Sequence, residues 1–591
     1  MPPPVQIAYR QVDLAAAGVN GYVGFNPHTE YLKKGDKPFG ARAVDCDITV
    51  EHDVTITVRD GCRLFVDICR PTNPKGPVPA ILSYSPFGKK FSGKVFLDES
   101  PWLPYHCGVT DGDISGLEKF EGVDPATWCA KDYAVVSVDA RGAGDSDGAV
   151  VIMGTQEGED GYDVIEAIAK MDWCNGSVGL AGNSHLGIVQ WFIAQLNPPS
   201  LKAIAPWEAC SDLYREQFVR GGIFNMSNFE YITKKIIQGR VGVEDFREMY
   251  RRADNGLMNP YWADKRADMK SIRTPAFITG SEFSSLHTMG SLRGFMELGT
   301  EDKWLRWSAT QEWYDLWAVK EHNDELVEFF DFFLKQGKQN GWREKTPKCR
   351  MSLLRFGQQG PIENVVVPDF PLPQTDYRSL YFAPEGKLLD KVPTASGLVS
   401  YQTQVATDIA SFTYTFDKKT TLCGLPKAVV YMSCQEADDL CVGVQIRKLG
   451  SDGKALKHLT IPFERAGIKD PEEAPMSGVV IHTGPVGFLR ASHRAVDPSK
   501  SMHPQYPYHP HEQLEKVPPG TVVKLEIGIF MMGSQYEAGE SVRVDIMASN
   551  PLIFPDSTDP KGALLPDNKG RHKVHFGGEY PSCIILPFAE L

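Results

Sequence analysis

The sequence lacks the features that would place a chain in a membrane or on nucleic acid. It contains no apolar run of transmembrane length, and its first residues, MPPPVQIAYRQVDLAAAG, lack the basic start and apolar stretch of a secretory signal. Basic residues are outnumbered, and the formal net charge of −13 disfavours nucleic acid and anionic membrane surfaces as partners. We therefore expect a cytoplasmic protein with no nucleic-acid partner and no membrane partner.

The cysteines also lack a functional pattern. The chain has 12 cysteines, and none of them forms a C-x-x-C pair. In a chain of this length such scattered cysteines indicate buried thiols rather than a disulfide framework or a zinc site. The sequence predicts no metal site and no cofactor. It leaves open whether the protein forms a homo-oligomer.

The first part of the chain alternates short apolar runs with helical patterns, which is typical of a parallel sheet flanked by helices. With 591 residues the chain is too long for one core, so two or three domains are expected. We predict an α/β core made of residues 1–207 and 271–355, including an N-terminal arm. The expected buried strands share an apolar run that ends in a turn, and they lie at 79–88, 133–142, 177–184, 201–207 and 274–280.

Two further segments interrupt or follow this alternation. Residues 208–270 carry helical patterns between two expected strands, which indicates a helical cap over an active site. Residues 356–377 are rich in proline and mark a boundary. Beyond it the apolar residues alternate with polar ones, so 356–591 is predicted to be an all-β sandwich.

One short stretch is typical of a catalytic serine. In GLAGNSHLG, residues 179–187, an apolar strand runs into Ser184 and then into a helical pattern. This strand–turn–helix context is the one that holds a nucleophilic serine above a sheet. The small residue that usually follows two positions after the serine falls one position later here, at Gly187. A serine that merely caps a helix is the alternative interpretation.

Two further motifs precede the serine turn, a D-x-R-G-x-G-x-S-x-G loop at 139–148 and a W-x-N-G-x-V-G run at 173–179. Together with the turn they resemble the cocaine-esterase-like hydrolases of the X-prolyl dipeptidyl peptidase (S15) group. The stretches 484–501, 506–530 and 538–554 resemble the jelly-roll domain of that family. The resemblance implies an α/β-hydrolase core, a cap and a jelly-roll domain, with Ser184 as nucleophile.

The rest of the catalytic set that this resemblance implies is not where it is expected. The position of the tyrosine that donates to the oxyanion is Phe87, which has no hydroxyl. The loop 279–295, where the acid is expected, contains no aspartate, and the stretch 303–317 contains no histidine. Gln311 stands in place of that histidine. The backbone N–H of the residue after Ser184 is the one oxyanion donor that matches.

Other side chains could replace the missing groups. His287 lies just beyond the expected acid position, and an imidazole is a suitable base near pH 7. Glu312 and Asp315 lie near the missing histidine and Glu282 near the missing aspartate, so each could orient His287 or act as base. His185 follows the serine and is expected in the cavity. Each also has an ordinary structural interpretation, as a loop histidine, a surface carboxylate or a pocket side chain.

The sequence leaves three functions open. The first is hydrolysis or transfer of an acyl group of a bulky apolar small molecule through Ser184; residues such as Trp313 favour an apolar or aromatic substrate. The second is a non-hydrolytic reaction of secondary metabolism, such as cyclisation, isomerisation, dehydration or carbon–carbon cleavage, using His185, His287 and the nearby carboxylates. The third is a binding protein without catalytic activity.

Overall fold

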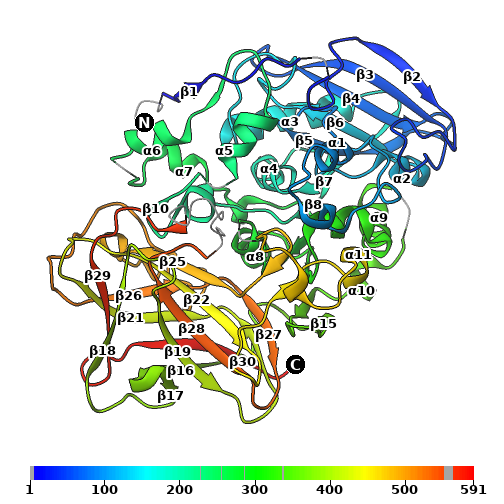
Figure 1. The fold of residues 1–591 in the computed structure, drawn as a ribbon. Helices are drawn as coiled ribbons and strands as arrows, with labels where there is room; N and C mark the ends of the chain where they lie inside the picture. Colours follow the sequence, from blue (N-terminus) through cyan, green and yellow to red (C-terminus); the bar gives the residue numbers. More distant parts are fainter. Residues whose placement is uncertain are drawn as a thin grey trace.

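The computed structural model describes residues 6–591 with the exception of 17, 227, 255, 285, 336–338 and 552–562. Its chain forms two large β-sheets, one in each half of the sequence (Figure 1). Among the described residues, no helix combines the length and the apolar character needed to cross a membrane.

The first sheet is the core of the N-terminal half. Its strands lie in the order β15-β14-β13-β12-β8-β7-β5-β6-β4-β3-β2. The neighbours from β14 to β6 run parallel, and both margins are antiparallel. The central strands share a nearly complete burial, and they are β5 (Val78–Ser85), β6 (Ala134–Asp139), β7 (Cys174–Asn183), β8 (Leu201–Trp207), β12 (Ala276–Gly280) and β13 (Lys303–Trp307). The outer strands are β2 (His28–Leu32), β3 (Ile48–Thr57), β4 (Arg63–Pro71), β14 (Cys349–Leu353) and β15 (Ile362–Val367).

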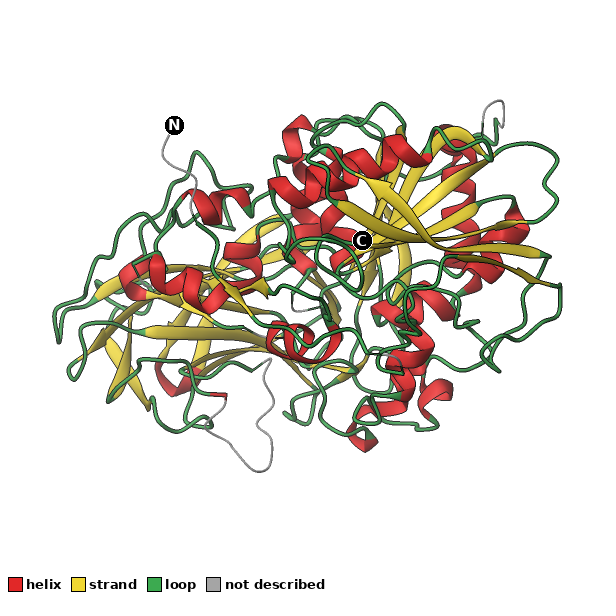
Figure 2. Cartoon of the chain, turned by 90° about the horizontal axis from the view of Figure 1, so that it is seen from above, coloured by secondary structure: helices red, strands yellow, loops and turns green. Residues whose placement is uncertain are grey.

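Helices cover both faces of this sheet (Figure 2). Helix α4 (His185–Ala194) packs against β7 and β8, and α3 (Thr155–Ile168) packs against α4. Helix α9 (Lys320–Leu334) also contacts β7 and β8. Every residue of α4 is buried, and the strands below it are rich in valine, isoleucine and alanine, so an apolar core lies between this helix and the sheet. These observations confirm the predicted α/β core.

The segment predicted as a cap lies between β8 and β12, which are neighbours in the sheet. It contains helices α5 (Phe229–Tyr231), α6 (Phe246–Arg252) and α7 (Pro260–Asp264). It also contains two wide helical turns (Leu213–Phe218 and Ile232–Ile236) and the short strands β9 (Val219–Arg220), β10 (Ile223–Phe224) and β11 (Val243–Glu244). Strand β11 pairs with β1 (Tyr9–Arg10) of the N-terminal arm, so the arm holds this segment.

The C-terminal half is a mostly antiparallel β domain, as predicted. Its strands enclose a second apolar core in which Phe382 of β16 (Asp376–Ala383) stacks on Phe412 of β19 (Ala410–Thr415), with ring centroids 4.2 Å apart. The other strands of the same sheet are β17 (Lys387–Leu389), β18 (Gly397–Gln402), β20 (Thr420–Gly424), β21 (Lys427–Cys434), β22 (Cys441–Leu449), β25 (Val486–Arg490), β26 (Val523–Gly528), β27 (Met532–Tyr536), β28 (Ser541–Met547), β29 (Arg571–Phe576) and β30 (Cys583–Ala589).

The core sheet extends further along the chain than the sequence predicts. Residues 356–377 are expected to mark the boundary between the two domains, yet β15 lies inside this range and pairs with β14 of the core sheet. Its side chains are mostly exposed, as expected for an edge strand, so its apolar signal is weak. The first strand of the second sheet, β16, begins at Asp376.

Candidate active site

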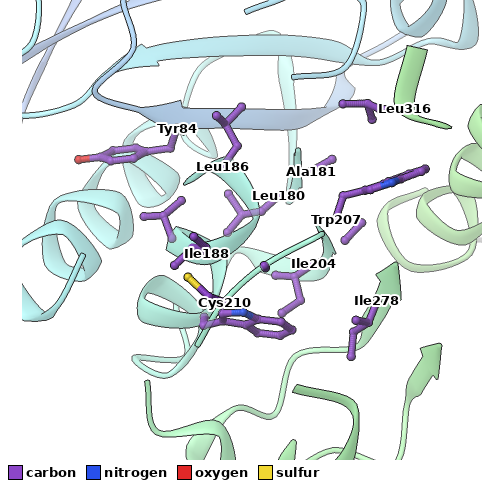
Figure 3. Close-up of a cluster of buried hydrophobic side chains, with 14 of the residues drawn as sticks. Tyr84, Leu180, Ala181, Leu186, Ile188, Ile204, Trp207, Cys210, Ile278 and Leu316 are labelled. Atoms are coloured by element: carbon purple, nitrogen blue, oxygen red, sulfur yellow. The ribbon is translucent and has the colours of Figure 1, made fainter. Parts of the chain in front are cut away.

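A sharp turn between β7 and α4 presents Ser184 above the core sheet. Ser184 has φ 52° and ψ −118°, a backbone conformation that a serine adopts only under strain. Its N–H donates to the carbonyl oxygens of Trp207 and Glu208 at 3.0 and 3.2 Å. Position 182 requires glycine, because a Cβ there would lie 2.5 Å from the Cβ of Leu186. The apolar side chains around Leu186 and Trp207 fix strand and helix beneath the turn (Figure 3).

His287 faces this serine. Its Nε2 lies 3.2 Å from the Oγ of Ser184, within hydrogen-bond reach of a base and a nucleophile. The two residues come from different loops, Ser184 after β7 and His287 after β12, and His287 immediately precedes α8 (Thr288–Glu297). Both loops lie at the carboxyl edge of parallel strands, which is where sites form in such sheets.

The other ring nitrogen of His287 leads to a carboxyl group. Its Nδ1 lies 2.8 Å from the Oγ of Ser284, and Ser284 also forms a hydrogen bond with Glu312. For His287 to accept the proton of Ser184 at Nε2, Nδ1 must carry a proton and donate it to Ser284. The Ser284 hydroxyl then donates to the Glu312 carboxylate. The four side chains form one directed relay, Ser184–His287–Ser284–Glu312.

The pKa values along this relay are shifted by burial. Burial and the nearby charge of Arg220 lower the pKa of His287 to about 3, so the imidazole is neutral at physiological pH. Burial raises the pKa of Glu312 to about 7, although hydrogen bonds from Ser284 and Asn183 oppose the shift. The group that changes its charge near neutral pH is therefore the carboxyl group.

Two more buried carboxyl groups, those of Glu208 and Glu121, lie beside Ser184 and His287. The sequence analysis missed both. The pKa of Glu208, next to the β8 end, is raised well above its usual value by burial and by the charge of Glu312. The same two causes raise the pKa of Glu121, whose Oε1 accepts from the Nδ2 of Asn183 and the Nε1 of Trp313, both at 3.1 Å. Neither carboxyl group lies in a local motif, since tertiary structure alone brings them beside Ser184.

The oxyanion donors are only partly recognisable. The N–H of His185 is the first of helix α4, so it has no acceptor within the helix and faces the turn that carries Ser184. Phe87, at the implied tyrosine position, lines the cavity with an apolar ring and supplies no hydroxyl. Of the two expected oxyanion donors, the backbone N–H after Ser184 is present, and the tyrosine hydroxyl is absent from position 87.

A cavity of about 210 Å³ opens over Ser184 and His287. Its wall includes side chains from the β5–β6 connection, from the cap and from the C-terminal domain, such as Trp102, Tyr231 and Val479. Among the described residues that line it, none is a lysine or an arginine. The lining residues that are apolar or aromatic are Phe87, Phe96, Trp102, Phe120, Tyr231, Ile232, Ile236, Phe283, Leu286, Trp313 and Val479.

The remaining predicted site residues divide between the cavity and its surroundings. Gln311 and Trp313 line the cavity, and the Gln311 side chain accepts from the N–H of Trp313 at 2.8 Å. Asp315 does not line it and is instead 2.7 Å from His322, which corrects its assignment to the pocket. Sequence position alone could not show this, because the contact with His322 depends on how the turn Tyr314–Ala318 packs against α9.

His185 and Glu282 also need correction. The Nε2 of His185 lies 3.0 Å from the Oε1 of Glu157 on α3, and His185 does not line the cavity in the described part of the chain. Glu282 accepts a hydrogen bond from the N–H of Gly533 in the C-terminal domain and does not line the cavity either. Both side chains form a hydrogen bond with a buried group, Glu157 for His185 and the Gly533 N–H for Glu282, and neither faces the cavity.

Comparisons with protein families agree with this architecture. Residues 60–313 match the X-Pro dipeptidyl-peptidase (S15 family) domain, and residues 340–585 match the X-Pro dipeptidyl-peptidase C-terminal non-catalytic domain. Among curated proteins, the cocaine esterase of Rhodococcus sp. (strain MB1 Bresler) is 36% identical over 172 residues. That match spans 29% of this chain and 26% of the esterase.

Solved structures extend the similarity to nearly the whole chain. A CocE/NonD family hydrolase from Staphylococcus aureus is 29% identical, with a TM-score of 0.84, over 98% of this chain and 99% of the hydrolase. An α-amino acid ester hydrolase shares the fold at 15% identity and a TM-score of 0.64, over 94% of this chain and 99% of that one.

Proposed function

The chain belongs to the X-Pro dipeptidyl-peptidase (S15) family, and from this premise we propose that it hydrolyses an ester or amide bond of a bulky apolar small molecule through Ser184. The observation that carries the proposal is the 3.2 Å contact between the Ser184 Oγ and the His287 Nε2. A serine needs such a base because its hydroxyl is a weak nucleophile at neutral pH.

The reaction proceeds in two acyl-transfer steps. His287 takes the proton of Ser184 as the Oγ attacks the carbonyl carbon, and the N–H of His185 stabilises the oxyanion. His287 then returns the proton to the leaving alcohol or amine. A water molecule, deprotonated by the same imidazole, releases the acid from Ser184. The Ser284 hydroxyl and the Glu312 carboxylate hold His287 in the required tautomer and stabilise its protonated form.

The lining of the cavity supports an uncharged, apolar substrate. Aromatic side chains dominate its wall, and its polar groups gather around Ser184. An anionic substrate would find no lysine or arginine among the described lining residues, and it would face the carboxyl groups of Glu121 and Glu312.

A fluorophosphonate probe tests the proposal directly. We expect intact-mass spectrometry to show one adduct on the wild type and none on Ser184→Ala, because only an activated serine reacts with the probe. The variant His287→Ala should react at least about 100-fold more slowly, since it lacks the base. A folded wild-type protein that forms no adduct contradicts the proposal.

A non-hydrolytic reaction is the second candidate, and one observation favours it. Three carboxyl groups with raised pKa values, Glu121, Glu208 and Glu312, surround a neutral imidazole, so the site can donate and accept protons near pH 7. Cyclisation, isomerisation, dehydration or carbon–carbon cleavage would then proceed without acylation of Ser184. Turnover that persists in Ser184→Ala would identify this alternative, and absence of turnover with retained ligand binding would identify a binding protein.

A further inference from the structure

Two histidines and a glutamate meet on the outer margin of the core sheet, away from the C-terminal domain (Figure 1). Strand β2 is the edge strand and pairs antiparallel with β3, in a register that places His28 directly opposite His52. Side chains two positions apart along a strand share a face, so Glu30 projects on the same side as both histidines.

The three side chains are close enough to share one ion. The rings of His28 and His52 stack with their centroids 4.4 Å apart and an angle of 15° between their planes. The Nε2 of His52 lies 3.2 Å from the Oε2 of Glu30. One ligand atom from each of the three residues lies within 4.8 Å of the other two. Binding one ion at the 2.0–2.2 Å that Zn²⁺ requires turns the two imidazoles out of this parallel stack, so that both ring planes pass through the metal.

Each imidazole of the proposed site also contacts an oxygen atom through its Nδ1, and this contact orients the ring. The Nδ1 of His28 lies 2.6 Å from the backbone oxygen of Asn26, and the Nδ1 of His52 lies 3.4 Å from the Oδ2 of Asp67. The backbone oxygen of Asn26 can only accept, so the Nδ1 of His28 carries the proton and its Nε2 keeps the lone pair. His52 lies between the carboxylates of Asp67 and Glu30, so a metal ion at its Nε2 takes the place of the proton shared with Glu30.

We propose that His28, Glu30 and His52 bind one divalent transition-metal ion of the Zn²⁺ class. Two imidazole nitrogens and one carboxylate oxygen form a three-ligand set, and water completes a tetrahedron because the site is open to solvent. The ion ties the edge strand β2 to β3. The sequence analysis predicted no metal site because the ligands, at positions 28, 30 and 52, lie on two strands and meet only through the strand register.

Cobalt substitution tests this site on the full-length protein after treatment with a chelator. We expect Co²⁺ to produce the visible absorption of a four-coordinate ion, saturating at one equivalent and abolished by one equivalent of Zn²⁺. His28→Ala and Glu30→Gln should each weaken Co²⁺ binding by at least about 10-fold, since each removes one ligand. Esterase activity should be unchanged in both variants.

An exposed histidine outside the cluster provides the control. His106→Asn should bind Co²⁺ as the wild type does, and asparagine suits the positive φ of 46° at that position. Equal binding by the wild type and His28→Ala would overturn the proposal. Binding that survives in His28→Ala but is lost in Glu312→Gln would overturn it too, because the ion would then sit among Glu208, His287 and Glu312.

Discussion

In the proposed mechanism, the charge of Glu312 controls the relay to Ser184. It reaches His287 through the Ser284 hydroxyl instead of contacting the imidazole directly. When Glu312 loses its proton, the imidazolium formed during catalysis gains an opposite charge and becomes easier to form. The ionisation of Glu312, and not that of His287, therefore sets the lower limit of the active pH range.

We expect kcat/KM to rise as the pH increases through about 7, the pKa of Glu312. Glu312→Gln should remove this rise and lower kcat by roughly 100- to 10,000-fold, as loss of an orienting carboxylate does in a catalytic triad. Ser284→Ala should lower kcat similarly, and Ser284→Thr, which keeps the hydroxyl, should restore most of it. A wild-type pH profile in Glu312→Gln would exclude Glu312 from the relay.

The same carboxyl group makes the fold less stable above neutral pH. Its pKa is raised from about 4.5 to about 7 on folding, so the folded protein holds this proton more tightly than the unfolded chain does. The free energy of unfolding therefore falls as the pH rises from about 4.5 through 7, by roughly 3 kcal/mol from this group. Glu312→Gln should show a higher denaturant midpoint than the wild type at pH 8 and a similar one at pH 4.

At the scale of single elements, the contact between α4 and β8 positions the nucleophile. A Cβ at Gly187 would lie 2.8 Å from the carbonyl oxygen of Trp207 and 3.1 Å from the Cβ of Ala209. The first of these atoms is backbone, so the helix and not a side chain must move. A small residue is therefore required at 187, one position later than in the usual motif.

Gly187→Ala should lower the free energy of unfolding by about 1–3 kcal/mol, although alanine favours a helix more than glycine does. The displaced Ser184 should lose about 100-fold in kcat, as a misplacement of 1 Å does. Denaturant unfolding and steady-state kinetics measure the two effects. The control is Gly76→Ala, whose new Cβ meets no atom within 4 Å. A more stable Gly187→Ala variant with full activity would contradict the close packing.

The loops after β12 and β13 explain why the site looked incomplete in the sequence. The family resemblance implies an acid on the first loop and a histidine on the second, and the structure has His287 on the first and Glu312 on the second. Because both loops leave neighbouring parallel strands at the same edge, either one reaches Ser184. We interpret the site as one in which histidine and carboxylate have exchanged loops.

At the scale of the whole molecule, Glu282 joins the two halves of the chain. Its buried carboxyl group accepts from the N–H of Gly533, and its Oε1 lies 3.4 Å from the Nε2 of His482. It also lies on the loop that carries His287. The contact therefore links the position of the base to the packing of the C-terminal domain.

Glu282→Ala should lower the free energy of the first unfolding transition by about 1–3 kcal/mol, because the N–H of Gly533 then remains buried without an acceptor. Glu282→Gln, whose amide oxygen still accepts, should lose less. Thermal unfolding of the three proteins measures the difference. Equal unfolding temperatures for Glu282→Ala and the wild type would show that this contact does not stabilise the domain interface.

Much of this architecture could be predicted from the sequence. The contacts that could not be predicted all depend on tertiary packing instead of a local pattern. The buried parallel strands carry continuous apolar runs, and the turn at Ser184 carries its own glycines, so both are local signals. The pairing of His185 with Glu157 is not local, because it depends on α3 packing against α4. Glu121 and Glu208 likewise enter the site only once the sheet has formed.

The exchange of histidine and carboxylate between two loops has a consequence for how such a site arises by mutation. On this interpretation at least two substitutions separate the two arrangements, one on each loop. A chain that carries neither histidine has no imidazole beside Ser184, and it retains only the modest rate that oxyanion contacts and substrate binding supply.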